Sequence, residues 1–385
     1  MESRIQDYRE HPGLNQSLLK ALLKGGVKAF KAQQQQDNTD LFYEEKSHII
    51  YGNGVDTLIT MGEEYFHQKY YAASVNKPSA AIMSIVQQTL ENAKIKYGSL
   101  EVLLEEAPQL SDHIQLIYDS CELHQYFMNR RKDNWEQDTR PASIVKEGFY
   151  YWKELIESAG KQILTPEENE IIFAVYKSLT SHPVTREFFE LSEGVELKFQ
   201  EPIYFTFRGH SCKMLPDWYI VNHNAKTVQP FDLKTTRNAA VNFLWDVKNY
   251  RYDFQAAWYT IGFKETYLRL GYTVLPFKFM VETTERDAQG QPCVFTCSPD
   301  MLSFATHGRP KMYEHFKPEG YTDVTDAVDK EHLVYSVPVV KEVLGVNQAL
   351  DLYEWHLENG FETDRIIIEN QNQFIMSYDE LLFVK

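Results

Sequence analysis

The middle of the chain, between residues 195 and 236, limits the fold more than any other part. Residues 195–207 alternate and are rich in β-branched and aromatic side chains, and residues 214–221 and 227–233 have the same strand-like character. The polar residues 222–226 between the last two runs are typical of a turn. Because helical patterns lie on both sides of these strands, we expect an α/β protein with a mixed central sheet flanked by helices.

Helical patterns account for much of the remaining sequence. They are expected at residues 16–24, 79–132, 167–179, 246–264 and 350–359. Asn15 can cap the first of these helices, and Gly25 with Gly26 can end it. A further strand is expected at residues 272–282, followed by a hairpin turn at 287–291.

The length of 385 residues alone indicates two to three domains, but one domain that carries helical insertions fits it equally well. We expect a single domain over residues 1–385, with its core at about 45–300. An N-terminal helical segment is expected at 8–44 and an insertion at about 307–341.

The net charge of −16 argues against a broadly basic surface for nucleic acid, although a local basic channel in an acidic protein would still admit DNA. The charged first ten residues lack the apolar core of a secretory signal, and no apolar run is long enough to span a membrane. The four cysteines are too few and scattered for a disulfide framework; they are Cys121, Cys212, Cys293 and Cys297. We therefore expect a cytosolic protein with free thiols and no membrane partner.

Three residues of the strand region have the spacing of a catalytic metal site. Asp232 and Lys234 point to the same face of a strand because side chains alternate, whereas Leu233 points to the opposite face. Asp217 lies fifteen positions upstream, at a break in the preceding strand caused by Pro216. If the two strands are hairpin neighbours, both carboxylates converge on one side of the sheet.

Metal-dependent phosphodiester hydrolysis requires such an arrangement. A hard cation held by oxygen ligands neutralises the scissile phosphate and helps to generate hydroxide from water. Asp217, Asp232 and the backbone carbonyl of Leu233 are the candidate ligands, and oxygen ligands suit both Mg²⁺ and Mn²⁺. Lys234 would orient the attacking water or stabilise the charge that develops on the phosphoryl oxygens. Because a D-x-K tripeptide alone is common, the prediction depends on the residues around it.

Two groups of residues strengthen the prediction of a catalytic site. Glu196, in the strand before this pair of strands, would complete the metal shell, although a solvated strand position explains it equally well. Tyr252, Gln255 and Tyr259 have the spacing that places them on one face of a helix. A buried aromatic face explains the tyrosines, but a lone amide among aromatic side chains needs hydrogen-bond partners.

Lys20, Lys24 and Lys28 recur at four-residue spacing in the first expected helix, which places Lys20 and Lys24 on one face. These two lysines either contact a DNA backbone or form a solvated face. Arg251 is a third expected contact to DNA.

Four motifs follow one another along the chain: HPGLNQSL at 11–18, GNGVDTLI at 52–59, TT at 235–236 and YRYDFQAAWY at 250–259. Together with the D-x-K strand they resemble the exonuclease domain of phage and prophage recombination exonucleases typified by exonuclease VIII. This RecE-like family belongs to the PD-(D/E)xK nucleases. The resemblance covers roughly residues 8–300, and Asp56 stands where the family usually has histidine.

The resemblance implies a restriction-endonuclease-like fold and an exonuclease that digests the 5′-ended strand of linear duplex DNA, exposing 3′ single strands for recombination. It identifies Gln255 and Tyr259 with the family's Q-x-x-x-Y motif. It also implies a ring-shaped homo-oligomer and a single-strand annealing protein as partner. Aspartate can bind Mg²⁺, so Asp56 is an expected metal ligand. Alternatively, Asp56 only caps or salt-bridges the start of a helix that begins near Gly54.

Two other classes of protein compete with this interpretation. A related nuclease with an iron–sulfur cluster would need a downstream cysteine trio, whereas only Cys293 and Cys297 are available there. A catalytically inactive nuclease fold could serve for DNA binding or assembly, but such copies usually lose a ligand or the lysine. Asp217, Asp232 and Lys234 are all retained here.

Overall fold

The computed structural model describes residues 2–36, 47–190, 192–309, 312–315, 336–340 and 343–369. The chain divides into two compact units, the first formed by residues 1–44 with 178–385 and the second by residues 45–177. The second unit is thus inserted in sequence into the first. These boundaries differ from the core of 45–300 expected from the sequence, and the single domain over 1–385 stays a prediction.

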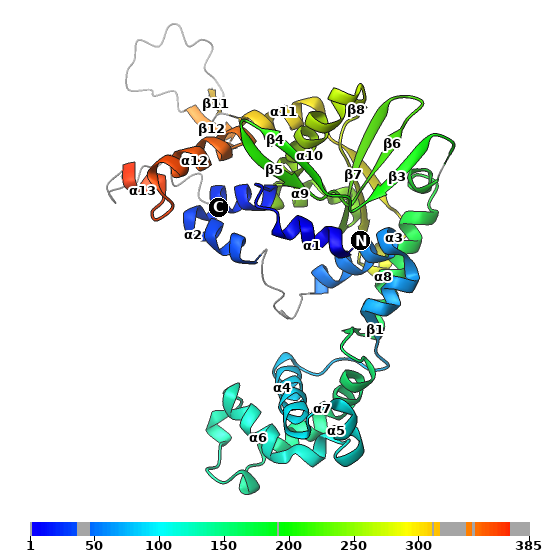
Figure 1. Ribbon diagram of the computed structural model, residues 1–385, viewed down its shortest axis with the longest axis vertical. Helices are drawn as coiled ribbons and strands as arrows, with labels where there is room; N and C mark the ends of the chain where they lie inside the picture. Colours follow the sequence, from blue (N-terminus) through cyan, green and yellow to red (C-terminus); the bar gives the residue numbers. More distant parts are fainter. Residues whose placement is uncertain are drawn as a thin grey trace, which may run out of the picture. The chain divides into compact units, whose positions relative to one another are not determined.

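The first unit is built on a mixed sheet (Figure 1). Its strands, in spatial order, are β10 (Cys293–Thr296), β9 (Lys278–Thr283), β7 (Thr227–Thr236), β6 (Trp218–Asn222) and β3 (Val195–Phe199). The strands β7 and β9 run parallel, as do β7 and the short β8 (Thr273–Val274), whereas the other neighbours are antiparallel. The predicted mixed sheet flanked by helices is confirmed, and the restriction-endonuclease-like assignment stays a prediction.

Helices and two separate two-stranded antiparallel sheets complete the first unit. They are α1 (Glu2–Glu10), α2 (Gln16–Gln36), η4 (Arg186–Phe189), β4 (Ile203–Phe207), β5 (His210–Met214), η5 (Ala240–Asn242), α9 (Leu244–Tyr250), α10 (Tyr252–Tyr267), η6 (Leu268–Leu270), η7 (Arg286–Ala288), α11 (Pro299–His307), β11 (Met312–His315), β12 (Ser336–Val340), α12 (Val346–Asn359) and α13 (Arg365–Glu369). Most of the predicted insertion at 307–341 lies outside the described residues.

The helix α10 is the centre of the core of this unit. Phe254, Trp258 and Phe263 on it are fully buried in one cluster with residues of the sheet and of the β4–β5 hairpin. Gly262 allows α10 to lie close to the β4–β5 hairpin, because a Cβ there would lie 2.6 Å from the sulfur of Met214.

The long helix predicted at 246–264 is in fact two helices, α9 and α10. Arg251 separates them with a left-handed backbone, at φ 54°.

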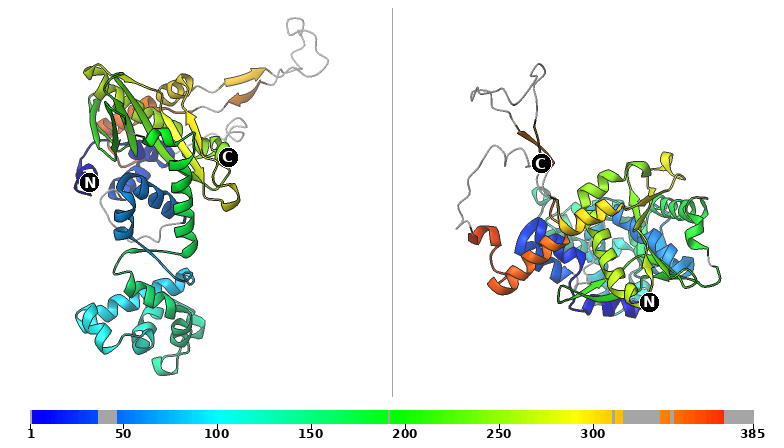
Figure 2. Two further views of the ribbon diagram at one scale, coloured as in Figure 1. Left: turned by 90° about the vertical axis from the view of Figure 1, so that its right-hand side faces the viewer. Right: turned by 90° about the horizontal axis from the view of Figure 1, so that it is seen from above.

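The N-terminal helix α2 begins and bends as its sequence indicates. The Asn15 side chain caps it by accepting a hydrogen bond from the amide of Leu18 at 2.9 Å. The backbone leaves the helical region at Gly26, where the helix was predicted to end, but helical residues resume as far as Gln36. Apolar residues of α2 pack against α12, so these two helices, far apart in the sequence, lie side by side (Figure 2).

Lys213 holds the segment before α2 against the β4–β5 hairpin. Its buried ammonium donates to the carbonyls of Tyr8, Arg9 and His11 at 2.8, 3.2 and 2.7 Å. Leu14 adds two backbone hydrogen bonds to the hairpin edge. A cation at the last carbonyls of α1 satisfies groups that the helix itself leaves unpaired.

The second unit is mainly helical. It contains α3 (Ser47–Lys69), β1 (Tyr70–Ala72), α4 (Ala80–Tyr97), α5 (Leu100–Glu106), η1 (Leu110–His113), α6 (Ile114–Leu123), η2 (Met128–Arg130), η3 (Trp135–Gln137), α7 (Arg140–Glu157), β2 (Gln162–Leu164) and most of α8 (Pro166–Ser181). An apolar core formed mainly by α4, α6 and α7 includes the fully buried Ile85, Ile117 and Trp152. No helix of the described residues is both long and apolar enough to cross a bilayer.

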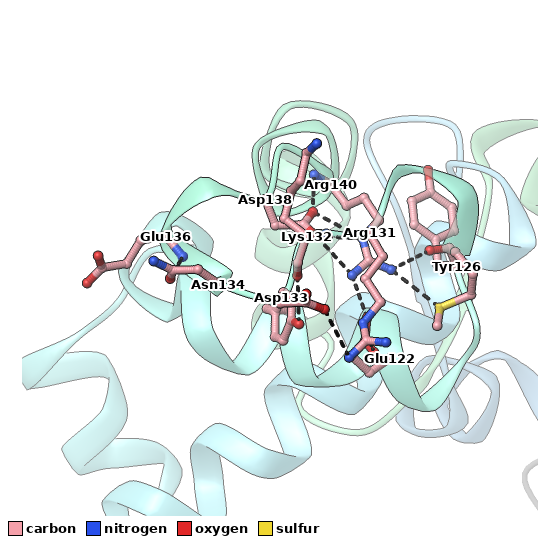
Figure 3. A network of polar contacts seen from close by, with 11 residues as sticks. Glu122, Tyr126, Arg131, Lys132, Asp133, Asn134, Glu136, Asp138 and Arg140 are labelled. Atoms are coloured by element: carbon pink, nitrogen blue, oxygen red, sulfur yellow. Dashed lines mark hydrogen bonds and ion pairs between the residues drawn. The ribbon is translucent and has the colours of Figure 1, made fainter.

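A buried arginine ties together the loop between α6 and α7 (Figure 3). The guanidinium of Arg140 donates to both carboxylate oxygens of Asp138, to the carbonyl of Tyr126 and to Glu122. The side chains of Arg140 and Asp138 are 1% and 0% exposed. Both charges are removed from water, so each is stabilised mainly by its partner, and the loop is held in the conformation that keeps them paired.

Candidate active site

The register of β6 and β7 brings the two predicted carboxylates together. Trp218 pairs with Phe231, so Asp217 and Asp232 are the next residues along the two neighbouring strands. One carboxylate oxygen of Asp217 accepts a hydrogen bond from the amide of Leu233 at 2.7 Å. Asp217 is therefore tied directly to the D-x-K segment, as the predicted hairpin requires.

Asp232 is the most enclosed member of the group, with 1% of its surface exposed. One oxygen accepts a hydrogen bond from the Gln255 side-chain amide at 2.7 Å, and the other contacts the Lys234 ammonium. The ammonium also lies 4.8 Å from the centre of the Tyr252 ring. The structure thus joins Asp217, Asp232, Lys234 and Gln255 in one cluster at the end of β7.

Lys234 is a cation in this cluster. Burial acts to lower its pKa, but the neighbouring charges of Asp232 and Asp217 outweigh burial and raise the pKa. At neutral pH the side chain therefore supplies positive charge beside the carboxylates.

The helix α10 holds the cluster in place through hydrogen bonds. Tyr259 donates a hydrogen bond from its hydroxyl to the carbonyl of Leu215 at 3.0 Å and so holds the segment that leads into Asp217. Burial, with the charges of Tyr8, Asp232 and Asp217, raises the pKa of Tyr259 well above its ordinary value. This hydroxyl therefore remains a hydrogen-bond donor throughout the neutral range.

The predicted basic residues differ in their surroundings. Lys20 is half-buried and donates to the carbonyl of Tyr250 at 3.4 Å. Burial and the positive charge of Lys234 lower the pKa of Lys20 to about 8. Lys24 is exposed, whereas Arg251 pairs with Asp253 at 2.9 Å and also donates to the carbonyl of Leu344. Lys20 is thus the predicted DNA contact that lies within electrostatic reach of the cluster.

Glu196 is not brought to this cluster. It pairs with Val221 in the register of β3 and β6, four positions along β6 from Asp217. At the usual rise per residue this offset corresponds to roughly 13 Å along the strand. Its carboxylate is exposed and lies 3.3 Å from the His223 ring and 3.8 Å from Lys198. Glu196 therefore occupies a solvated strand position, which was the alternative to a metal ligand.

Asp56 belongs to the second unit, inside α3. The predicted helix start near Gly54 is wrong, because α3 begins at Ser47, so Asp56 cannot be the cap of this helix. Its role as a metal ligand stays a prediction. Among the residues that the structure describes, no group of three or more His, Cys, Asp or Glu side chains is arranged to hold a metal ion. All four cysteines are free.

Two residues that the sequence analysis did not single out are Tyr8, which acts on the site residue Tyr259, and Lys213, which contacts Tyr8. The Lys213 ammonium lies 4.7 Å from the centre of the Tyr8 ring, and the charge of an ionised Tyr8 raises the pKa of Tyr259. One signal in the sequence pointed to Lys213, a single lysine between the apolar Cys212 and Met214 of a strand. Nothing in the sequence pointed to Tyr8.

Comparisons with known proteins add little to this geometry. No family model matches the chain, and no curated protein matches it. Among solved structures, the chain is similar to a crystal structure of a "Putative exonuclease" from Eubacterium rectale, at 14% identity and a TM-score of 0.29. That match covers 55% of this chain and 77% of the other. A likeness of this size does not establish a common fold or function.

The contacts of α10 predict different effects for Gln255 and Trp258. Gln255→Ala removes a donor to Asp232, and loss of such a supporting hydrogen bond typically lowers activity or metal affinity 10- to 100-fold, by order of magnitude. Trp258 is fully buried and donates to the carbonyl of Lys213, so Trp258→Phe should lower the melting temperature with little effect on any catalytic activity of the folded protein. Steady-state rates at equal folded fraction compare the two variants. A larger loss of turnover in Trp258→Phe would mean that α10 acts only through packing.

Proposed function

We propose that this protein is a metal-dependent nuclease that hydrolyses phosphodiester bonds in DNA. The observation that carries the proposal is the convergence of Asp217, Asp232 and Lys234 at the end of the β6–β7 pair, with Gln255 bonded to Asp232. Two acidic groups beside a half-buried cation suit a reaction at a phosphate, where negative charge must be both neutralised and held in position.

The donor set fits a hard divalent cation. Mg²⁺ is usually bound through one or two carboxylates together with water and substrate oxygens, and Asp217 and Asp232 provide two. The carbonyl of Leu233 accepts a hydrogen bond from the Lys234 ammonium at 3.3 Å. These three groups would hold Mg²⁺ or Mn²⁺. When bound, the ion would polarise the phosphate and lower the pKa of water.

Each residue of the chain then has a defined task. The Lys234 ammonium supplies positive charge beside the reacting phosphate and can orient a water molecule through its N–H groups. Gln255 fixes the orientation of the Asp232 carboxylate. Tyr259 holds the backbone before Asp217, and Lys20 is suited to contact a neighbouring phosphate.

The finer assignment rests on the ordered motifs that resemble the RecE-like recombination exonucleases. On this basis we propose digestion of the 5′-ended strand of linear duplex DNA in a cytosolic setting. A ring-shaped homo-oligomer and a single-strand annealing partner belong to the same proposal. The competing candidate is an inactive nuclease-fold module that only binds DNA. Retention of all three residues favours the enzyme, with Lys234 in contact with Asp232 and Asp217 bonded to the amide of the intervening Leu233.

Digestion of end-labelled DNA tests both levels of the proposal. With Mg²⁺ we expect a linear duplex labelled at its 5′ end to release labelled nucleotide early, a 3′-labelled duplex to release it late, and a closed circle to remain intact. Chelation of the metal should stop all release. Early release from the 3′ end would contradict the polarity, and cleavage of the circle would contradict the need for an end. No metal-dependent release from any of these DNAs, by protein that binds them, would favour the inactive module.

A further inference from the structure

The segment between β7 and α10 exposes an apolar patch formed by Val241, Leu244, Trp245 and Tyr250. These side chains are 67%, 64%, 64% and 60% exposed. Val241 lies in η5, and Leu244 and Trp245 form the start of α9, whereas Phe243 and Val247 of the same segment are buried in the core. Large apolar side chains gathered at this exposure usually mark a binding surface.

Hydrogen bonds and ring contacts join the segment that carries the patch to the catalytic cluster and to Lys20. Thr236, at the end of the D-x-K strand, donates to the Asp246 carboxylate at 2.7 Å. The Tyr250 ring lies 5.6 Å from the Tyr252 ring, which in turn lies 4.8 Å from the Lys234 ammonium. The carbonyl of Tyr250 accepts the hydrogen bond from Lys20 noted above. A ligand on the patch would therefore continue from the cluster.

Charge on this segment favours a polyanion. Arg237 and Lys248 are both exposed, and the only carboxylate between residues 237 and 250 is Asp246, which is bonded to Thr236. Two cations and one carboxylate give this stretch a formal charge of +1, in a chain whose net charge is −16. A protein partner that only buries apolar surface would not require a positively charged segment in a negatively charged chain.

We propose that the apolar patch stacks against unpaired bases of the strand whose phosphate occupies the catalytic cluster. This inference rests on the proposed nuclease function and extends it to the substrate, which would be a single-stranded or frayed end. Aromatic rings accept any base on their faces, and interleaved cations contact the phosphates between bases. Trp245 and Tyr250 would supply the rings, and Arg237 and Lys248 the cations.

Binding of short oligonucleotides without metal tests the proposal separately from cleavage. Anisotropy of a labelled oligothymidylate and of an abasic oligomer of equal length would be measured in EDTA at fixed low salt. Trp245→Ala should weaken oligothymidylate binding about 5- to 150-fold, the usual effect of removing one stacked base, and should leave abasic binding unchanged. Trp245→Phe should restore most of the affinity, whereas Trp245→Leu should not. Leu270→Ala, at another side chain that is 63% exposed, is the matched control.

Other outcomes would overturn the inference. Equal weakening with both oligomers, or full restoration by Trp245→Leu, would show that the patch does not stack bases. Loss of self-association in Trp245→Ala, with DNA affinity unchanged, would identify the patch as an interface between copies of the chain. Base-dependent binding without any metal-dependent cleavage would retain the patch and remove the nuclease proposal.

Discussion

Asp232→Asn is expected to lower the rate of DNA cleavage by at least about a hundredfold while the protein stays folded and binds DNA. Asparagine keeps an oxygen that can accept the hydrogen bond from Gln255, but it removes the negative charge beside Lys234. Single-turnover cleavage at saturating Mg²⁺ measures the loss, and circular dichroism checks the fold.

Two further substitutions should match this loss for different reasons. Asp217→Asn keeps an acceptor for the Leu233 amide and loses a predicted metal ligand, whereas Lys234→Ala removes the cation. Glu196→Gln is the matched control, because Glu196 is a carboxylate of the same sheet outside the cluster. Near-normal turnover in any of the first three variants, or an equal loss in Glu196→Gln, would refute the assigned site.

The core of the candidate site could be predicted because strand geometry is strict. The alternation of side chains placed Asp232 and Lys234 on one face, and the short turn after β6 required β6 and β7 to pair, which brings Asp217 alongside. The helical spacing marked Gln255 as an amide in need of a partner, and the structure supplies Asp232. These predictions used only local rules.

The remaining contacts depend on tertiary structure. Glu196 could not be excluded from sequence, because its distance from the cluster follows from the register of β3, which the spacing between strands does not determine. The break at Arg251 interrupts a continuous helical pattern, and a left-handed residue other than glycine has no strong local signal. The contacts of Lys213 with the first helix join residues about two hundred positions apart.

Arg140→Met is expected to destabilise the second unit by about 3–5 kcal/mol, the usual cost of leaving one member of a buried ion pair without its partner. Asp138 would keep hydrogen bonds from the amides of Lys132 and Arg140 but would lose the guanidinium charge. Urea unfolding followed by circular dichroism measures the loss, and hydrogen exchange of α6 and α7 localises it. Arg131→Met is the matched control, because Arg131 contacts the same Glu122 (Figure 3) but is 45% exposed, and its loss should be much smaller.

The dependence of this effect on pH identifies the charge as its cause. Burial opposes ionisation of Asp138, but hydrogen bonds from Arg140 and Lys132 and the Arg140 charge lower its pKa below the ordinary value of 3.8. In the native protein this carboxylate therefore stabilises the fold above pH 4, and that contribution is lost as the pH falls through the lowered pKa. In Arg140→Met the guanidinium no longer opposes the effect of burial, so burial raises the pKa of Asp138. The ionised carboxylate then destabilises the fold at neutral pH. This destabilisation disappears when the carboxylate is protonated. The difference between the two proteins should thus be largest at neutral pH. It should shrink as the pH falls, first through the raised pKa of Asp138 in the variant and then through its lowered pKa in the native protein. The double variant with Asp138→Asn should recover part of the stability at pH 7. A difference that does not change with pH would mean that Arg140 acts through packing alone.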